Sequence, residues 1–140
     1  INMATFNKFD QFVADRSNGV HKLDSDTLKF ALTNTAPLAT NTVIANITQI
    51  GGVNGYTTGG TAVGITSSTQ TAGTYSLVPT ADVVFTAAGG SMGPFRYVVI
   101  YNSTAVGGPL IGWYDRGVAL TLLDTETFTV DVGATLLTDV

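Results

Sequence analysis

The segment from Gly93 to Gly117 limits the possible folds more than any other part of the chain. It contains two runs rich in aromatic and β-branched residues, 95–101 and 110–114, separated by a loop of Gly, Ser, Asn and Pro. Such runs favour β-strands and such a loop favours a turn, so the segment is predicted to be a β-hairpin. Apolar residues occur on both faces of each strand. The hairpin is therefore expected in the middle of a sheet or sandwich, covered on both sides.

The alternation of side chains along these two runs predicts which residues share a face of the sheet. On the first strand, one face carries Phe95, Tyr97, Val99 and Tyr101, and the other carries Arg96, Val98 and Ile100. On the second strand, Ile111 and Trp113 oppose Leu110, Gly112 and Tyr114. Trp113 alternates with other apolar residues, so its side chain is predicted to lie in the core.

Most of the remaining chain also fits short strands, because turn signals recur every ~8–12 residues. Strands are predicted at a half-buried segment 27–33 and around 63–65, 75–78, 82–86, 120–122 and 126–132. Residues 43–50 fit a helical stripe and a short strand equally, and residues 136–140 either pair as a last strand or fray. We therefore predict an all-β fold, an antiparallel β-sandwich of jelly-roll or Greek-key type, forming a single domain over residues 1–140.

One short helix is predicted at the N-terminus, over residues 5–15. Aromatic and aliphatic residues recur there at spacings of three and four, at Phe6, Phe9, Phe12 and Val13. Thr5 can cap the start and Asn18-Gly19 can end the helix. A helix this short is only marginally stable by itself, so its Phe side chains must pack against another part of the structure. They either pack on the sheet of the same domain, or residues 1–20 form a helical arm that reaches a neighbouring subunit.

Composition argues against several classes of function. The chain has no Cys, which excludes disulfides, Cys-ligated zinc and Cys nucleophiles. Six Lys and Arg residues spread along a chain of net charge −4 give no patch for nucleic acid. No apolar run approaches the ~20 residues of a membrane span. Charged residues make up only 11% of the chain, against about 25% in a typical domain. That suits either a protein packed against copies and neighbours or a neutral, Thr-rich sheet surface.

The residues that could carry chemistry are few. The single His21, close to Asp24 and Asp26, is expected to be a solvated loop residue, because a metal site needs more ligands of matched type. The glycine-rich segment 51–60 lacks the Gly-Lys-Ser/Thr ending of a phosphate loop and no clear helix follows it. Its glycines are therefore predicted to serve turns and bulges.

An acidic cluster at Asp124, Glu126 and Asp131 is the best candidate for catalysis or calcium binding. Paired carboxylates serve glycosidases, and carboxylate oxygens bind calcium. The simpler interpretation is a solvated turn beside a polar sheet face. We therefore predict no enzymatic activity, no cofactor and no metal.

Several stretches taken together resemble a known family. They are SDTLKFAL at 25–32, TNTAP at 33–37, NGYTTGG at 54–60, FRYVVIY at 95–101 and LIGWYD at 110–115. In order and spacing they are similar to a family of small structural proteins of tailed bacteriophages and prophages. The resemblance spans most of the chain, from the Phe-rich N-terminal segment to the strand of Phe128. Its motifs are structural rather than catalytic.

The resemblance implies a capsid decoration (cement) protein on the exterior of the virion, made in the host bacterial cytoplasm. Its partners would be the major capsid protein and further copies of itself, as a homotrimer, with neither nucleic acid nor membrane involved. A tail or fibre component that binds carbohydrate or a receptor is the alternative. In that case Tyr56, Trp113 or Tyr114 would be exposed and would stack on sugars.

Two parts of the chain supply candidate interface residues. The N-terminal segment and the glycine-rich loop offer Phe6, Phe9 and Tyr56, where Tyr56 is either an exposed contact or a cover for the end of the sheet. The hairpin loop, residues 102–109, offers Asn102, Ser103 and Thr104. This loop is where a partner contact is expected.

Overall fold

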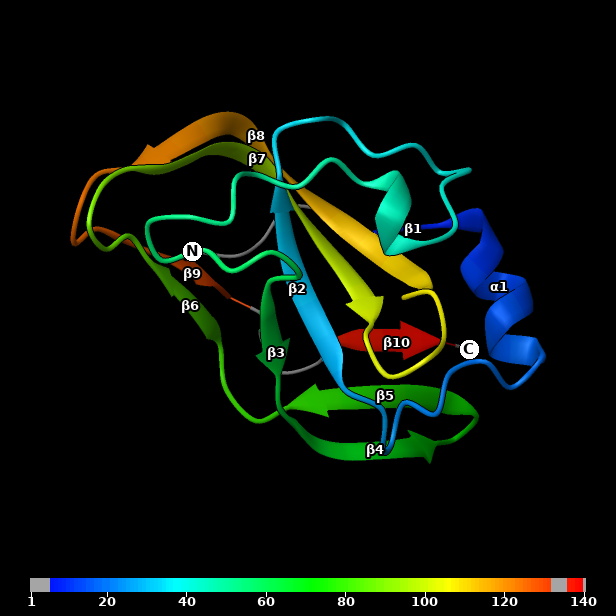
Figure 1. Cartoon of the computed structure of the whole chain (residues 1–140). Helices are drawn as coiled ribbons and strands as arrows, with labels where there is room; N and C mark the ends of the chain where they lie inside the picture. The colour runs from blue at the N-terminus through cyan, green and yellow to red at the C-terminus, as the bar shows by residue number, and fades with distance from the viewer. Residues whose placement is uncertain (1–5, 132–135, 140) are drawn as a thin grey trace.

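The computed structural model describes residues 6–131 and 136–139, and antiparallel sheets dominate it (Figure 1). The five-stranded sheet has the order β1-β8-β7-β2-β3, the three-stranded sheet β10-β5-β4, and the two-stranded sheet β6-β9. The strands are β1 (Phe6–Lys8), β2 (Leu28–Thr33), β3 (Thr61–Val63), β4 (Ile65–Thr71), β5 (Thr74–Pro79), β6 (Val83–Thr86), β7 (Met92–Asn102), β8 (Leu110–Leu122), β9 (Thr127–Val130) and β10 (Leu137–Asp139). The predicted all-β antiparallel fold with one short helix is confirmed.

The predicted hairpin forms the centre of the five-stranded sheet. β7 pairs with β8 on one side and with β2 on the other, and β1 and β3 are the edges. β8 continues to Leu122, so the strand predicted at 120–122 is the far end of the same strand. β2 was expected to be half-buried, yet five of its six residues are buried. It lies between two strands in a sheet that has apolar side chains packed on both faces.

Two β-bulges change the predicted faces of this hairpin. Phe95 packs in the same cluster as Val98 and Ile100, because the register shifts between Phe95 and Tyr97. On β8, Ile111 belongs with Tyr114 rather than with Trp113, because the register shifts again where Ile100 is followed by Tyr101. At the second shift β8 has one extra residue, Ile111, and at the first shift β8 advances by five residues while β7 advances by two. Such irregular pairing changes the face on which the side chains around it lie.

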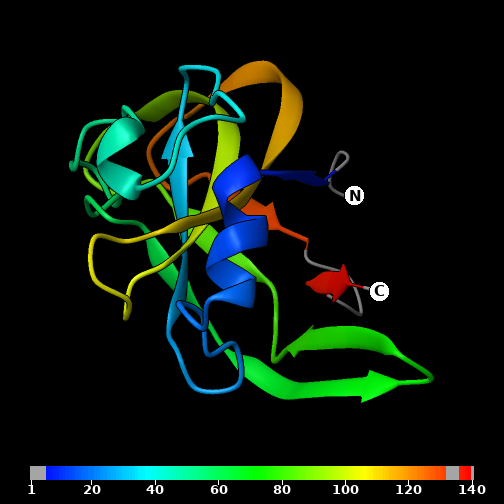
Figure 2. The same cartoon turned by 90° about the vertical axis from the view of Figure 1, so that its right-hand side faces the viewer.

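A large and a small hydrophobic cluster cover the two faces of the five-stranded sheet. The large cluster joins this sheet to the other two through Leu77, Phe85 and Val130. The small cluster lies on the opposite face and is built from Phe9, Ala31, Ile47, Val99, Tyr101 and Leu110. In the side view of Figure 2, the turn of the 3-10 helix lies on one side of β2 and β10 on the other. Trp113, expected in the core, is only half-buried against the small cluster.

The N-terminal helix begins later than predicted. Helix α1 spans Asp10–Ser17, while residues 6–8 form β1 and pair with β8. Thr5, the expected cap, lies outside the described residues; Phe9 occupies the N-cap position without a side-chain cap. Gly19 has φ +74°, so the predicted left-handed ending is confirmed. Phe9 and Phe12 are fully buried within the chain. No helix in the described part of the chain is long and apolar enough to cross a membrane.

Residues 43–50 form neither of the two predicted structures. They contain a single 3-10 turn, η1 (Ile44–Asn46), and two isolated bridges, Val43 with Pro109 and Gln49 with Thr33. The Asn46 side chain accepts hydrogen bonds from the backbone N–H groups of Thr42 (3.0 Å) and Val43 (3.1 Å), which closes the turn. This segment covers the small cluster and contacts the end of the hairpin loop.

Candidate functional site

A buried polar network around Asn102 fixes the start of the β7–β8 loop. The Asn102 side chain is completely buried at the end of β7. Its Nδ2 donates to Asp26 Oδ2 (2.7 Å) and to His21 Nδ1 (3.1 Å). Its Oδ1 accepts from the backbone N–H groups of Thr104 (3.0 Å) and Ala105 (3.2 Å). One amide therefore ties the loop to a segment about 80 residues earlier in the chain.

Further bonds hold the loop at both ends, and the Gly108 N–H donates to the Ala105 carbonyl (3.2 Å) to close the turn at its apex. The backbone N–H and the hydroxyl of Ser103 both donate to the Thr27 carbonyl (2.9 Å each), and Thr104 Oγ1 accepts from the Thr27 N–H (2.8 Å). At the other end, the Gly108 carbonyl accepts from the Ile44 N–H (2.8 Å). Between these anchors Val106 is fully exposed. The loop thus presents an apolar side chain on a fixed backbone.

His21 is buried, which corrects the expectation of a solvated residue. Only 9% of its surface is exposed, and its ring lies 5.2 Å from the Phe12 ring between centroids. Because Nδ1 accepts from Asn102, the neutral ring carries its proton on Nε2, which has no hydrogen-bond partner among the described residues. Burial lowers the pKa of His21, although the carboxylates of Asp15 and Asp26 oppose this shift.

We expect the network to make folding sensitive to mild acid. The pKa of His21 is lowered in the folded state, so the unfolded chain binds this proton more readily. Stability should be constant above the unfolded pKa of about 6.5 and should fall as the pH drops from there to the lower folded pKa. Urea unfolding between neutral and mildly acidic pH measures this slope.

His21→Gln is the matched control, since its amide oxygen can still accept from Asn102 and it does not titrate. The variant should lose the slope in this pH window. Asp26 does not contribute there: burial raises its pKa, but hydrogen bonds from Asn102 and Lys22 outweigh this and hold its pKa below the usual value. Equal slopes in both proteins would contradict the assignment to His21.

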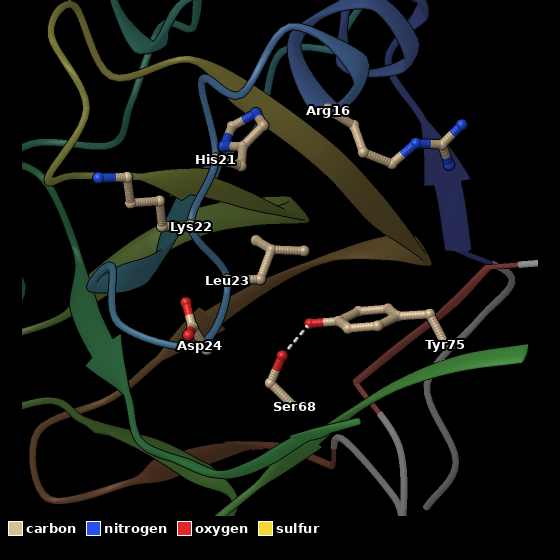
Figure 3. A pocket seen from close by; sticks show the side chains of 7 residues that line it. All are labelled: Arg16, His21, Lys22, Leu23, Asp24, Ser68 and Tyr75. Atoms are coloured by element: carbon tan, nitrogen blue, oxygen red, sulfur yellow. Dashed lines mark hydrogen bonds between the residues drawn. The ribbon is translucent and has the colours of Figure 1, made fainter. Parts of the chain in front are cut away.

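A pocket of about 270 Å³ lies beside this network, between α1 and the β4–β5 hairpin (Figure 3). It is lined by Arg16, His21, Lys22, Leu23, Asp24, Ser68 and Tyr75. In Figure 3 the charged ends of Arg16 and Lys22 point in opposite directions. Tyr75 Oη and Ser68 Oγ hydrogen-bond each other (2.6 Å). The polar groups therefore do not converge on one point where a reacting group could sit.

Tyr56 belongs to the core rather than to a surface contact. Its hydroxyl accepts from the Leu32 N–H (3.1 Å) and donates to Gln49 Oε1 (2.5 Å), which also accepts from the Gly59 N–H (2.8 Å). The hydroxyl of Tyr101 donates to the Gly59 carbonyl (2.6 Å). The glycine-rich loop is thus packed onto the sheet, and its amides serve this packing.

Half of the six predicted interface residues are unavailable to a partner. Phe9, Tyr56 and Asn102 are buried inside the chain, and Phe6 and Ser103 are half-buried. Thr104 is exposed. Of the three candidates in the loop, only Thr104 is therefore fully accessible to a partner. The exposed Val106 was missed, although its place between the polar start of the loop and Gly107-Gly108 could have pointed to it.

The aromatic residues considered for sugar binding do not form an exposed platform. Burial raises the pKa of both Tyr56 and Tyr114 to about 12. Trp113 packs its ring 4.6 Å from that of Phe9, measured between centroids. These three side chains are occupied by packing.

Two members of the acidic cluster, Asp124 and Glu126, lie in a turn, as the simpler interpretation predicted, whereas Asp131 directly follows β9. Asp124 Oδ1 accepts from the Gly89 N–H (2.9 Å), and Glu126 Oε1 accepts from the Leu123 N–H (2.7 Å). Thr125 between them has φ +74°. Over residues 6–131 and 136–139, no three His, Asp or Glu side chains are grouped as a metal site would need.

The fold and the site define an all-β protein of antiparallel sheets with a loop that is anchored by hydrogen bonds at both ends and carries an exposed apolar side chain at its apex. Comparison of the chain with family models, curated proteins and solved structures finds no match.

Proposed function

We propose that the chain is a non-enzymatic structural protein of a bacteriophage virion and that it binds the outer surface of the capsid as a decoration protein. The observation that carries the proposal is the β7–β8 loop, with Val106 fully exposed on a backbone fixed by Asn102, Thr27 and Ile44. The sequence resemblance supplies the phage context. The low content of charged residues, 11%, fits a surface used in assembly.

A fixed loop is suited to this role because it loses little conformational entropy on binding. Burial of an exposed Val side chain contributes about 1.5 kcal/mol or more. A decoration protein binds in many copies, so a modest contribution from each copy adds up over the shell. Each copy that binds only the mature lattice stabilises that state by mass action.

We expect Val106→Asp to weaken binding to shells by at least about tenfold, because methyl groups that would be buried on binding are replaced by a charge that must be desolvated. The measurement is co-sedimentation of the purified protein with expanded shells that lack it. Val118→Asp is the matched control, since Val118 is also exposed (68%) but lies on β8, outside the loop.

Equal loss of binding in the two variants would show that the loop is not the surface that contacts the shell. Failure of the unmodified protein to bind shells would overturn capsid decoration altogether. Co-purification with tails rather than heads would favour the tail or fibre alternative.

A further inference from the structure

β4 is an unusually open edge strand. It is the outer strand of the order β10-β5-β4, and no strand among residues 6–131 and 136–139 pairs with its free side. The other edge strands β1, β3, β10, β6 and β9 are only three or four residues long. β4 has seven residues, ITSSTQT, with neither a charge nor a proline. Natural proteins commonly guard sheet edges with short strands, charges, prolines or bulges.

The hairpin geometry shows which backbone groups are free along this edge. β4 and β5 are joined by a two-residue turn in which both φ angles are positive (51° and 84°), and Thr71 pairs with Thr74 next to it. In such a hairpin the pair flanking the turn is hydrogen-bonded, and bonded and non-bonded pairs alternate from there. Thr69 therefore directs its N–H and C=O toward β5. Ser68 and Gln70 direct theirs outward.

The edge is also accessible. One feature that would hinder pairing at this edge is a bulge between Ile65 and Ser67, at the start of the strand. Residues 67–71 remain regular. β4 lies at the lower margin of the chain in both views, and the hairpin projects away from the body in Figure 2. A second extended strand can approach along its full regular length.

We propose that β4 pairs with β4 of a second copy of this chain, antiparallel and across a two-fold axis at Thr69. In this register Ser68 of each copy faces Gln70 of the other, and the outward N–H and C=O groups of both residues bond in reciprocal pairs. Thr69 then faces itself in a non-bonded pair, a favourable cross-strand contact. A strand that meets itself brings each charge close to its own copy, so the absence of charge on β4 favours a second copy as the occupant.

This pairing goes beyond capsid binding and does not depend on it. It uses the β4–β5 hairpin, whereas the proposed shell contact uses the β7–β8 loop. A two-fold pairing closes as a dimer. It therefore differs from the homotrimer implied by the sequence resemblance.

Cysteine cross-linking tests the position of the proposed two-fold axis at Thr69. The chain contains no Cys, so an introduced Cys can form a disulfide only with the same residue of a second copy. In a non-bonded antiparallel pair the Cα atoms are about 4.5 Å apart, which a disulfide can span. Thr69→Cys should therefore form a disulfide-linked dimer on mild oxidation. Thr129→Cys is the matched control, an exposed Thr in a paired strand of another sheet, and should stay monomeric.

Sedimentation of the unmodified protein gives the second readout. Its mass should rise with concentration from that of the 14.5 kDa chain to twice that value. Thr69→Lys should abolish the rise, because two ammonium groups would oppose each other on the axis, and Thr129→Lys should preserve it. A strict monomer, a mass of three chains, or a dimer in which Thr69→Cys does not cross-link would each overturn the proposal. Shell binding by a strict monomer would leave the capsid proposal standing.

Discussion

Replacing Gly60 with Ala is expected to destabilise the fold by roughly 3–5 kcal/mol. Gly60 has φ +81°, a conformation that L-residues adopt only with strain. A Cβ atom there would overlap the carbonyl oxygen of Phe30, which lies in the middle of β2. Neither the loop nor the central sheet can move away without breaking other contacts. Urea unfolding at neutral pH measures the loss.

Gly73→Ala is the control that separates packing from backbone strain. Gly73 has nearly the same φ, +84°, but a Cβ atom there would meet nothing within 4 Å. It should cost only the strain of the left-handed conformation, about 1–2 kcal/mol. If the two variants were equally unstable, the close approach to Phe30 would be irrelevant. The glycine-rich loop would then require backbone freedom alone.

The role of Gly60 shows where prediction from the sequence stops. Composition alone indicated that residues 51–60 form turns rather than a phosphate site, because turn chemistry is local. Which glycine touches the sheet depends on how the loop packs onto β2, and Phe30 lies 30 residues earlier in the chain. The hydrogen bond from the Leu32 N–H to the Tyr56 hydroxyl could not be predicted for the same reason, because it also depends on how the loop packs onto β2.

The strands themselves were predictable because alternation and turn residues are local signals. The sides on which Phe95 and Ile111 lie were not predictable, because the shifts in register at these two places give no signal in a sequence pattern of period two. At the N-terminus the helical spacing of Phe6 and Phe9 was real but misleading. Pairing of Phe6 with Tyr114 at the sheet edge outweighs a weak helical preference over residues 6–8.

The sequence predicted that the loop is exposed, but it did not predict which residues hold the loop in place. The loop composition of residues 102–109 indicated an exposed contact, and Val106 is exposed there. Asn102 was expected to face a partner, but it faces Asp26 and His21 instead. These residues are 76 or more positions away, and no local pattern links them.

The second large effect is expected at Asn102. Asn102→Ala should cost roughly 3 kcal/mol, because it removes the four hydrogen bonds of one buried amide: those that it donates to Asp26 and His21, and those that it accepts from the Thr104 and Ala105 N–H groups. Asn46→Ala is the matched control: Asn46 also closes a turn by accepting two backbone N–H groups, but at an exposed site, so about 1 kcal/mol is expected. Thermal and urea unfolding compare the two. Amide hydrogen exchange at Thr104 should speed up only in the Asn102 variant.

Asn102→Asp tests whether the side chain at this position must be uncharged, because Asp has nearly the same shape as Asn but carries a negative charge. The new carboxylate keeps one oxygen for Thr104 and Ala105 but places the other where Nδ2 now lies, 2.7 Å from Asp26 Oδ2. Two carboxylates so close cannot both ionise, so the folded state takes up a proton more readily than the unfolded chain. The variant should therefore gain stability as the pH falls, whereas the unmodified protein loses stability through His21. A loss on acidification in both proteins would mean that Asn102 does not face Asp26. The fixed backbone of the loop, and with it the display of Val106, would then need another cause.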